Sequence, residues 1–256
     1  MVTAAAVELR NVSLTYHTPE GETKAIDDVT LRVEEGEFVS IVGPSGCGKT
    51  SLLSMIAGLM KPTSGVVLVH GAVVSGPNPA VGYMLQQDHL FPWRTVLDNC
   101  LLGLEVQGKR NAASRQRVLQ LLSDYGLRDF ARAFPAQLSG GMRQRAALVR
   151  TLALDPKVLL LDEPYSALDY QTRLQLQEEM SRILRAERRT VVLVTHDIAE
   201  AVSLADRVVV LTRRPARVKR EYVIDLPGRG SPVHVRESPD FSRYFRDIWR
   251  DLDVHL

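Results

Sequence analysis

The chain has 256 residues, of which 45% are hydrophobic and 24% are charged, and its formal net charge is +2. This composition is ordinary for a globular protein with a substantial core, and so small a net charge does not favour a nucleic-acid partner. The two cysteines lack the spacing of a metal site or a disulfide framework, which fits a reducing compartment. The sequence shows neither the apolar core of a signal peptide nor the ~20 consecutive apolar residues of a membrane span. We therefore expect any membrane role to depend on a partner.

The first part of the chain is dominated by predicted strands. The stretches 7–16, 28–36 and 37–43 have strand composition, and together they predict a small, largely antiparallel β-layer. Two further strands are expected at 65–71 and 80–87.

The middle of the chain changes to a helical pattern. Apolar residues recur at three- and four-residue spacing in 95–107, 114–127 and 139–154, which predicts amphipathic helices. We expect this block to form an inserted helical subdomain of about 87–154.

Two nearly continuous apolar runs follow the helical block. The runs 158–162 and 190–195 are typical of parallel strands buried on both faces, and the amphipathic stretch 168–188 between them completes a βαβ unit. The sequence therefore predicts an α/β fold with a mainly parallel sheet core. We place one domain at 1–212 and a C-terminal extension at 213–256.

A glycine-rich loop follows the predicted strand that ends at residue 42. The sequence GPSGCGKTS meets the pattern G-x-x-x-x-G-K-[ST] and leads directly into a helix, so its backbone N–H groups and the helix dipole favour an anion. Lys49 is placed to reach β- and γ-phosphates, and Thr50 to ligate Mg²⁺. A tight glycine turn before a helix is the alternative. The predicted nucleotide-binding residues of this loop are Gly43, Pro44, Ser45, Gly46, Cys47, Gly48, Lys49, Thr50 and Ser51.

Cys47 has a further expected property. A thiol in a glycine loop at a helix N-terminus is predicted to be exposed and to have a lowered pKa. Maleimide treatment is therefore expected to inactivate the protein.

Two adjacent carboxylates stand at the end of the run VLLLDEP. In open α/β sheets ligands bind at the carboxyl ends of strands, so Asp162 is a candidate Mg²⁺ ligand and Glu163 a candidate group for orienting or deprotonating an attacking water. Two solvated loop carboxylates are the alternative interpretation.

Two further motifs are weaker when taken alone. In LSGGM, Ser139 is a good helix N-cap, and Gly140 and Gly141 permit close backbone approach to a ligand, although a simple helix cap explains the same residues. His196 follows the strand TVVLVT at its carboxyl end, where it can face the phosphates or serve a structural role.

The order and spacing of these motifs, together with Gln86, the SALD run at 166–169 and TYH near the start, resemble the ATP-binding subunit of an ABC transporter. The resemblance covers residues 7–212 and implies an ABC-type P-loop NTPase fold, with ATP and Mg²⁺ as cofactors. It implies that Tyr16 stacks on adenine, and that Gln86, rather than the neighbouring Gln87, senses Mg²⁺ and the membrane subunit.

The same resemblance assigns roles to the remaining motifs. It implies catalysis by Glu163 and His196, with Lys49 on the phosphates and Asp162 on the metal. Asp169 matches a loop that crosses the dimer interface. Met142 stands where the family usually has glutamine, which puts a side-chain hydrogen bond at that position in question.

The expected partners follow from the resemblance as well. The signature Ser139–Gly141 of one subunit would close over the nucleotide of a second copy, giving a C₂ homodimer. Permease subunits would bind near HLFPWRTVLDN (89–99), whose apolar residues can also pack in the core, and a substrate-binding protein would act indirectly. We expect a peripheral position on the cytoplasmic face of the membrane.

The motifs FPWRTVLDN and LSGGMRQR most resemble those of nitrate, sulfonate and taurine importers, which indicates a small anion as the transported substrate. A soluble ABC ATPase acting on nucleic acid or ribosomes is an alternative, although such proteins usually carry two cassettes or long coiled-coil insertions. A regulatory module that binds ATP without turnover is a third, against which Glu163 and His196 argue.

The C-terminal extension carries two patterns. The stretch 213–220 is rich in Arg and Lys, which favours a solvated strand edge over contact with lipid or nucleic acid. The stretch 239–252 has an apolar helical face that we expect to dock on the domain rather than on a partner. That face consists of Phe241, Tyr244, Phe245, Ile248, Trp249 and Leu252.

Overall fold

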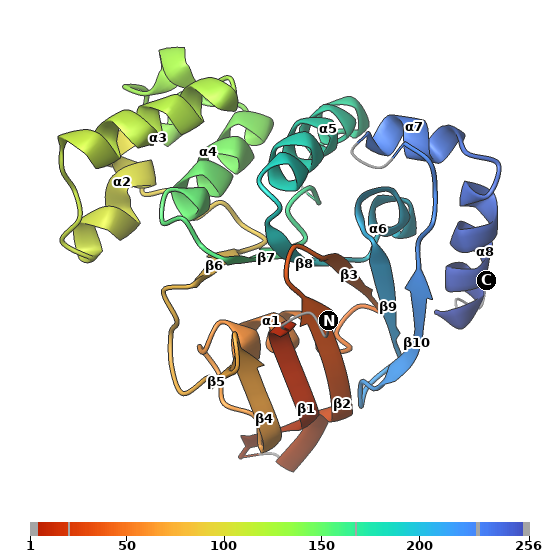
Figure 1. Ribbon diagram of the computed structural model, residues 1–256. Coiled ribbons are helices and arrows are strands. Elements are labelled where there is room, and N and C mark those ends of the chain that lie inside the picture. Colours follow the sequence, from red (N-terminus) through yellow and green to blue (C-terminus); the bar gives the residue numbers. More distant parts are fainter. Residues whose placement is uncertain (1–4, 20, 167, 229–230, 253–256) are drawn as a thin grey trace.

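The computed structural model describes residues 5–19, 21–166, 168–228 and 231–252. It contains two β-sheets and a set of helices, arranged as Figure 1 shows. The strands are β1 (Ala5–Thr18), β2 (Gly21–Glu34), β3 (Phe38–Val42), β4 (Ser64–Val69), β5 (Ala72–Val73), β6 (Val81–Met84), β7 (Val158–Asp162), β8 (Thr190–Thr195), β9 (Arg207–Leu211) and β10 (Val218–Val223). The α-helices are α1 (Lys49–Ile56), α2 (Val96–Val106), α3 (Ala112–Asp124), α4 (Gly140–Leu152), α5 (Tyr170–Ala186), α6 (Ile198–Leu204), α7 (Pro232–Glu237) and α8 (Phe241–Asp251).

The larger sheet has the strand order β10-β9-β3-β8-β7-β6. The pairs from β9 to β6 are parallel, and β10 pairs antiparallel with β9 at the edge. Every residue of β3, β7 and β8 is buried, as continuous apolar runs predict for parallel strands covered on both faces. This arrangement brings the carboxyl ends of β3, β6, β7 and β8 to one edge, and the α/β fold with a mainly parallel core is confirmed.

The smaller sheet is antiparallel, with the order β2-β1-β4-β5. The prediction that all of 7–16, 28–36 and 37–43 contribute to this layer is wrong for the last stretch, because 38–42 forms β3 in the centre of the parallel sheet. The physical reason is the absence of a polar face in Phe38–Val42. A strand that is apolar on both sides is stable only where both of its faces are covered.

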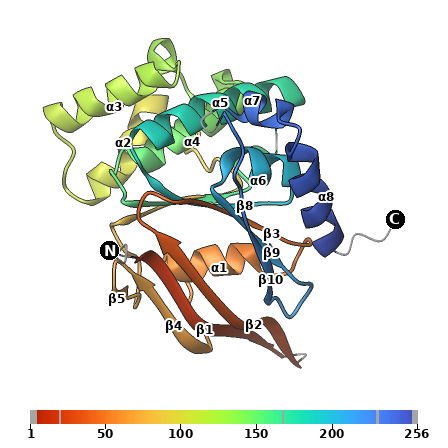
Figure 2. The ribbon, with the colours of Figure 1, turned by 45° about the vertical axis from the view of Figure 1, so that its right-hand side comes forward.

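Helix α1 lies between the two sheets (Figure 2). Its Leu52, Leu53 and Ile56 are fully buried and pack with residues of β1, β2 and β3 in one continuous core. A second core lies on the opposite face of the parallel sheet, where α5 and α6 pack. The parallel sheet is thus covered on both faces.

Helices α2, α3 and α4 form a lobe beyond the β6 edge of the parallel sheet (Figure 1). They pack on one another, and α4 also contacts β6. Each of the three begins at a residue whose side chain accepts a backbone hydrogen bond, namely Thr95, Asn111 and Ser139.

The C-terminal extension joins the sheet and then covers one side of it. Strand β10 has mostly exposed residues and forms the sheet edge, as expected for 213–220, although only 218–220 of that stretch belong to the strand and 213–217 form the turn before it. Helix α8 docks on the body through buried Ile248, while Trp249 is exposed. The other apolar residues packed there are Phe241, Tyr244, Phe245 and Leu252. In the described part of the chain, no helix combines the length and the apolar character needed to cross a membrane.

Candidate active site

The glycine-rich loop joins the end of β3 to the start of α1. Gly46 and Gly48 have φ angles of +71° and +120°, which a residue with a side chain adopts only with strain. The N–H of Cys47 donates to the carbonyl oxygen of Pro44 at 3.2 Å, and that of Leu52 donates to Gly48 at 3.0 Å as the helix begins. The loop therefore has the sharp turn that the motif predicts.

Lys49, the first residue of α1, reaches back across this loop. Its Nζ donates to the carbonyl oxygens of Gly43 at 2.8 Å and Pro44 at 3.1 Å, and the residue is only 6% exposed. The ammonium group of Lys49 is thus held beside the N-terminus of α1, where the helix dipole favours an anion.

Asp162 lies at the end of β7, facing the first turn of α1. Its Oδ1 accepts a hydrogen bond from Thr50 Oγ1 at 3.2 Å, and its Oδ2 accepts one from the Tyr83 hydroxyl at the same distance. Burial raises the pKa of Asp162, and burial likewise raises the pKa of Tyr83 to about 12. A carboxylate and a hydroxyl oxygen are ligands that suit Mg²⁺, so Asp162 and Thr50 fit that ion. Tyr83 was not among the predicted residues.

Glu163 stands between two other predicted residues. Its Oε2 accepts from Gln86 Nε2 at 3.1 Å, and its Oε1 lies 3.1 Å from His196 Nδ1. Gln86, Glu163 and His196 follow β6, β7 and β8, three adjacent strands that end at the same edge of the sheet. The backbone of Glu163 has φ +46°, which lies outside the strand region, and its N–H donates to the carbonyl oxygen of Val194 at 2.8 Å.

A cavity of about 330 Å³ opens above the glycine-rich loop. It is bordered by residues from the loop, from the acidic strand end, from β1 and from the turn between β9 and β10. They include Tyr16, Ser45, Lys49, Thr50, Glu163 and Arg214. The hydroxyl of Tyr16 is hydrogen-bonded to Ser51 Oγ at 2.8 Å, so an aromatic ring lies at the edge of this cavity.

The signature residues Ser139–Gly141 lie at the start of α4. Ser139 caps α4 by accepting from the N–H of Met142 at 3.3 Å, and a Cβ on buried Gly141 would approach Thr172 Cγ2 to 2.7 Å. Among the described residues, neither these nor Asp169, the N-cap of α5, line the cavity above the loop. Of the SALD run, residue 167 lies outside the described residues. One chain thus brings together the loop, the acidic pair, Gln86 and His196, but not the signature.

Cys47 differs from the prediction. It is 1% exposed, and burial raises the pKa of its thiol. Its side chain belongs to the buried core around α1 and does not line the cavity, and a Cβ on Gly43 would lie 2.8 Å from its Sγ. Only the backbone of Cys47 is available to a ligand in the loop, and the expected exposure and lowered pKa are wrong for this position. The expectation of inactivation by maleimide therefore loses its basis.

The family model described as ABC transporter matches residues 26–166, which is more than half of the chain. The chain belongs to the ABC transporter family. Its membership makes it an ABC-type ATPase, as predicted.

Several curated relatives align over nearly the whole chain. An uncharacterized ABC transporter ATP-binding protein, YtlC of Bacillus subtilis, is 44% identical, and the alignment covers 95% of this chain and 94% of that protein. The nitrate import ATP-binding protein NrtD of Synechocystis sp. is 40% identical over 94% of this chain and 93% of its own length. The taurine import ATP-binding protein TauB of Jannaschia sp. is 39% identical, covering 94% and 91% respectively.

Solved structures of the family resemble the chain in fold. The dimeric post-hydrolysis state of the ATP-binding cassette MJ0796 bound to ADP and Pi superposes with a TM-score of 0.75 at 35% identity, covering 86% of this chain and 99% of the cassette. A second dimeric structure of the same cassette gives a TM-score of 0.76. The predicted ABC-type fold is confirmed by these neighbours.

Proposed function

We propose that this chain is the ATP-hydrolysing subunit of an ABC importer and works as a homodimer bound to membrane permease subunits. The observation that carries the proposal is the position of Glu163. Its carboxylate lies between Gln86 and His196 at the rim of the cavity that also contains Lys49.

Each side chain around the cavity has a distinct role in the proposed reaction. Lys49 and the N–H groups of the loop bind the phosphates, while Glu163 orients or deprotonates the attacking water and His196 faces the terminal phosphate. Thr50 and Asp162 would hold Mg²⁺, which would neutralise charge on the phosphates. Tyr16 offers its ring to the adenine.

A second copy of the chain would complete the site. Ser139, Gly141 and Asp169 carry the signature and interface motifs, yet within one chain they lie away from the cavity. A C₂ arrangement allows each copy to present these residues to the nucleotide of the other. The dimeric structures of the cassette MJ0796 support this arrangement.

The surface beside Gln86 suits a permease. Phe91 and Trp93 stack with ring centroids 5.0 Å apart, although they are 37% and 70% exposed. Exposed stacked aromatic rings of this kind are typical of an interaction surface. A cavity of about 500 Å³ is lined by Gln86 and by His89, which precedes Phe91 by two residues in the chain, so a helix bound there would contact the same loop that reaches Glu163.

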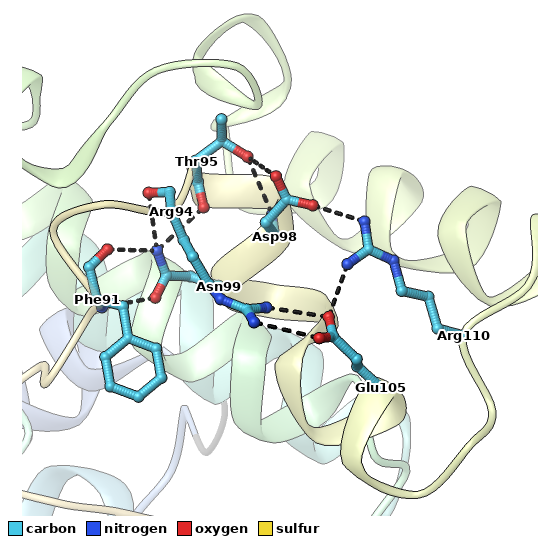
Figure 3. Close-up of polar contacts among 7 residues, drawn as sticks. All are labelled: Phe91, Arg94, Thr95, Asp98, Asn99, Glu105 and Arg110. Atoms are coloured by element: carbon cyan, nitrogen blue, oxygen red, sulfur yellow. Dashed lines mark hydrogen bonds and ion pairs between the residues drawn. The ribbon is translucent and has the colours of Figure 1, made fainter.

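The loop that carries Phe91 is held by polar contacts with residues of helix α2 (Figure 3). The buried amide of Asn99 accepts from the N–H of Phe91 at 2.7 Å and donates to the carbonyl oxygens of Phe91, Arg94 and Thr95. Arg94 pairs with both carboxylate oxygens of Glu105, at 3.0 and 3.1 Å. The rings are therefore presented on a preorganised loop, which lowers the entropic cost of binding a partner.

The transported substrate is proposed to be a small anion such as nitrate, a sulfonate or taurine, delivered by a substrate-binding protein. The support is similarity to relatives named as nitrate and taurine import subunits. The chain would then work at the cytoplasmic face of the membrane.

The decisive experiment uses Glu163→Gln, which removes the basic carboxylate and preserves the shape of the side chain. A general base typically contributes ~10²- to 10⁴-fold in rate, so turnover should fall to near background while ATP remains bound. Size-exclusion chromatography in MgATP should show a stable dimer that releases ATP on denaturation. Lys49→Ala should instead lose ATP affinity and stay monomeric. Wild-type hydrolysis by Glu163→Gln, or a monomer in saturating MgATP, would contradict the proposal.

A further inference from the structure

Arg214 lies in the turn between β9 and β10, outside the stretch that the family model matches. The turn is closed by two hydrogen bonds between its ends. The N–H of Thr212 donates to the carbonyl oxygen of Arg217, and the N–H of Arg217 donates to Thr212 Oγ1, each at 3.0 Å.

The same turn is fastened to β2. The N–H of Ala216 donates to Ala25 and the N–H of Asp27 donates to Ala216, both at 2.9 Å. The carboxylate of Asp27 also pairs with Lys24 and Arg217, and hydrogen bonds from these two cations lower its pKa. Because Ala25 borders the cavity, these contacts fix the turn beside the nucleotide site.

From this position Arg214 reaches the glycine-rich loop. Its Nη2 donates to the carbonyl oxygen of Gly46 at 2.8 Å, and its side chain borders the same cavity as Lys49 and Thr50. A guanidinium has five N–H donors, and this bond takes one of them. Arg214 precedes β10, so it is not part of the exposed strand edge that the basic pattern of 213–220 predicts.

The charges around the cavity indicate a role for the guanidinium group of Arg214. A nucleoside triphosphate carries several negative charges, and the cavity border already includes the carboxylate of Glu163. The planar guanidinium fork matches phosphate oxygens and keeps its charge at any physiological pH. A second cation beside Lys49 therefore favours the polyphosphate.

We propose that Arg214 is a nucleotide-positioning residue that holds the glycine-rich loop through Gly46 and contacts the phosphates of the bound nucleotide. The inference rests on the proposed function, and it extends the site to the C-terminal extension.

The test measures equilibrium binding of AMP, ADP and a non-hydrolysable ATP analogue to the full chain in Mg²⁺ buffer. Arg214→Ala should weaken binding of the analogue about tenfold, because a charge-assisted hydrogen bond to phosphate is lost, and should weaken binding of AMP less. Arg214→Lys should restore part of the loss. The matched control is Arg220→Ala, which removes the same charge from an exposed β10 position and should bind like wild type.

Arg214→Gln keeps a donor for Gly46 without the charge, so it provides the measurement if Arg214→Ala does not fold. Wild-type affinity in this variant, or equal losses for AMP and the ATP analogue, would overturn the phosphate contact. Lys49→Ala distinguishes a failure of the proposed function from a failure of the proposed role of Arg214. If it binds normally, the proposed function fails, whereas a loss with Lys49→Ala and none with Arg214→Ala refutes only the role of Arg214.

Discussion

The hydroxyl of Tyr83 donates to Oδ2 of Asp162 at 3.2 Å, joining the strands β6 and β7 beside the glycine-rich loop. Asp162 is 3% exposed, so its charged form depends on such hydrogen bonds. Thr50 supplies the other one, at Oδ1. The position of this carboxylate is thus set from two sides.

Tyr83→Phe should raise the pKa of Asp162 further, because burial already raises it and the lost hydrogen bond lowers it. As the solution is acidified, Asp162 would then become protonated at a higher pH than in the wild type. The acid limb of the ATPase pH profile should move upward, and the Mg²⁺ concentration for half-maximal rate should rise several-fold. The control is Tyr222→Phe, which removes the hydrogen bond that Tyr222 of the distant strand β10 donates to Asp251 of α8. An unchanged acid limb in Tyr83→Phe would show that the hydroxyl does not support Asp162.

Glu200 predicts a pH dependence of stability. Burial raises its pKa to about 8 from the ordinary 4.5, although Thr195 Oγ1 donates to its Oε2 at 2.8 Å. Between these values the folded state binds more protons than the unfolded state, so this group makes stability fall as pH rises, by up to roughly 1.4 kcal/mol per pH unit. Glu200→Gln should remove this slope, and urea unfolding at pH 6 and pH 8 measures it. The exposed Glu237→Gln should behave like wild type. Equal slopes in Glu200→Gln and wild type would contradict the raised pKa.

Both cysteines should resist modification in the native protein. Cys47 and Cys100 are buried, and burial raises the pKa of both thiols, that of Cys100 to about 12. Maleimide should label the folded chain slowly and leave ATPase activity intact, while unfolding in urea should release two reactive thiols. Ser242→Cys, at an exposed position of α8, should react at once and shows that the reagent is active. Rapid labelling of the native chain that disappears in Cys47→Ser would instead show that the thiol of Cys47 is exposed.

Trp93 should matter for membrane attachment. When the chain is co-expressed with its permease subunits, Trp93→Ala should reduce its recovery in the membrane fraction by about tenfold, as expected for an exposed aromatic at the centre of an interface. Trp249→Ala removes a ring of the same type from α8 and should leave the recovery unchanged. Thermal melting checks that both variants fold. Equal membrane recovery for the two variants would place the permease contact elsewhere.

The sequence by itself determined the features that depend on neighbouring residues. The loop from Gly43 to Lys49 follows from its glycine spacing, and the buried strands 158–162 and 190–195 follow from their apolar runs. Asp162 and Glu163 were placed at a strand end by the same pattern. Such features are local, because backbone conformation and the period of burial are decided within a few residues.

The tertiary structure alone decided which distant residues meet. It placed 38–42 in the parallel sheet, buried the thiol of Cys47, set Tyr83 against Asp162 and brought Arg214 to Gly46, 168 residues earlier in the chain. No local pattern encodes these contacts, since they depend on how the two sheets close around α1 and on where the β9–β10 turn crosses β2. Packing across the whole domain, rather than the propensity of any segment, fixes them.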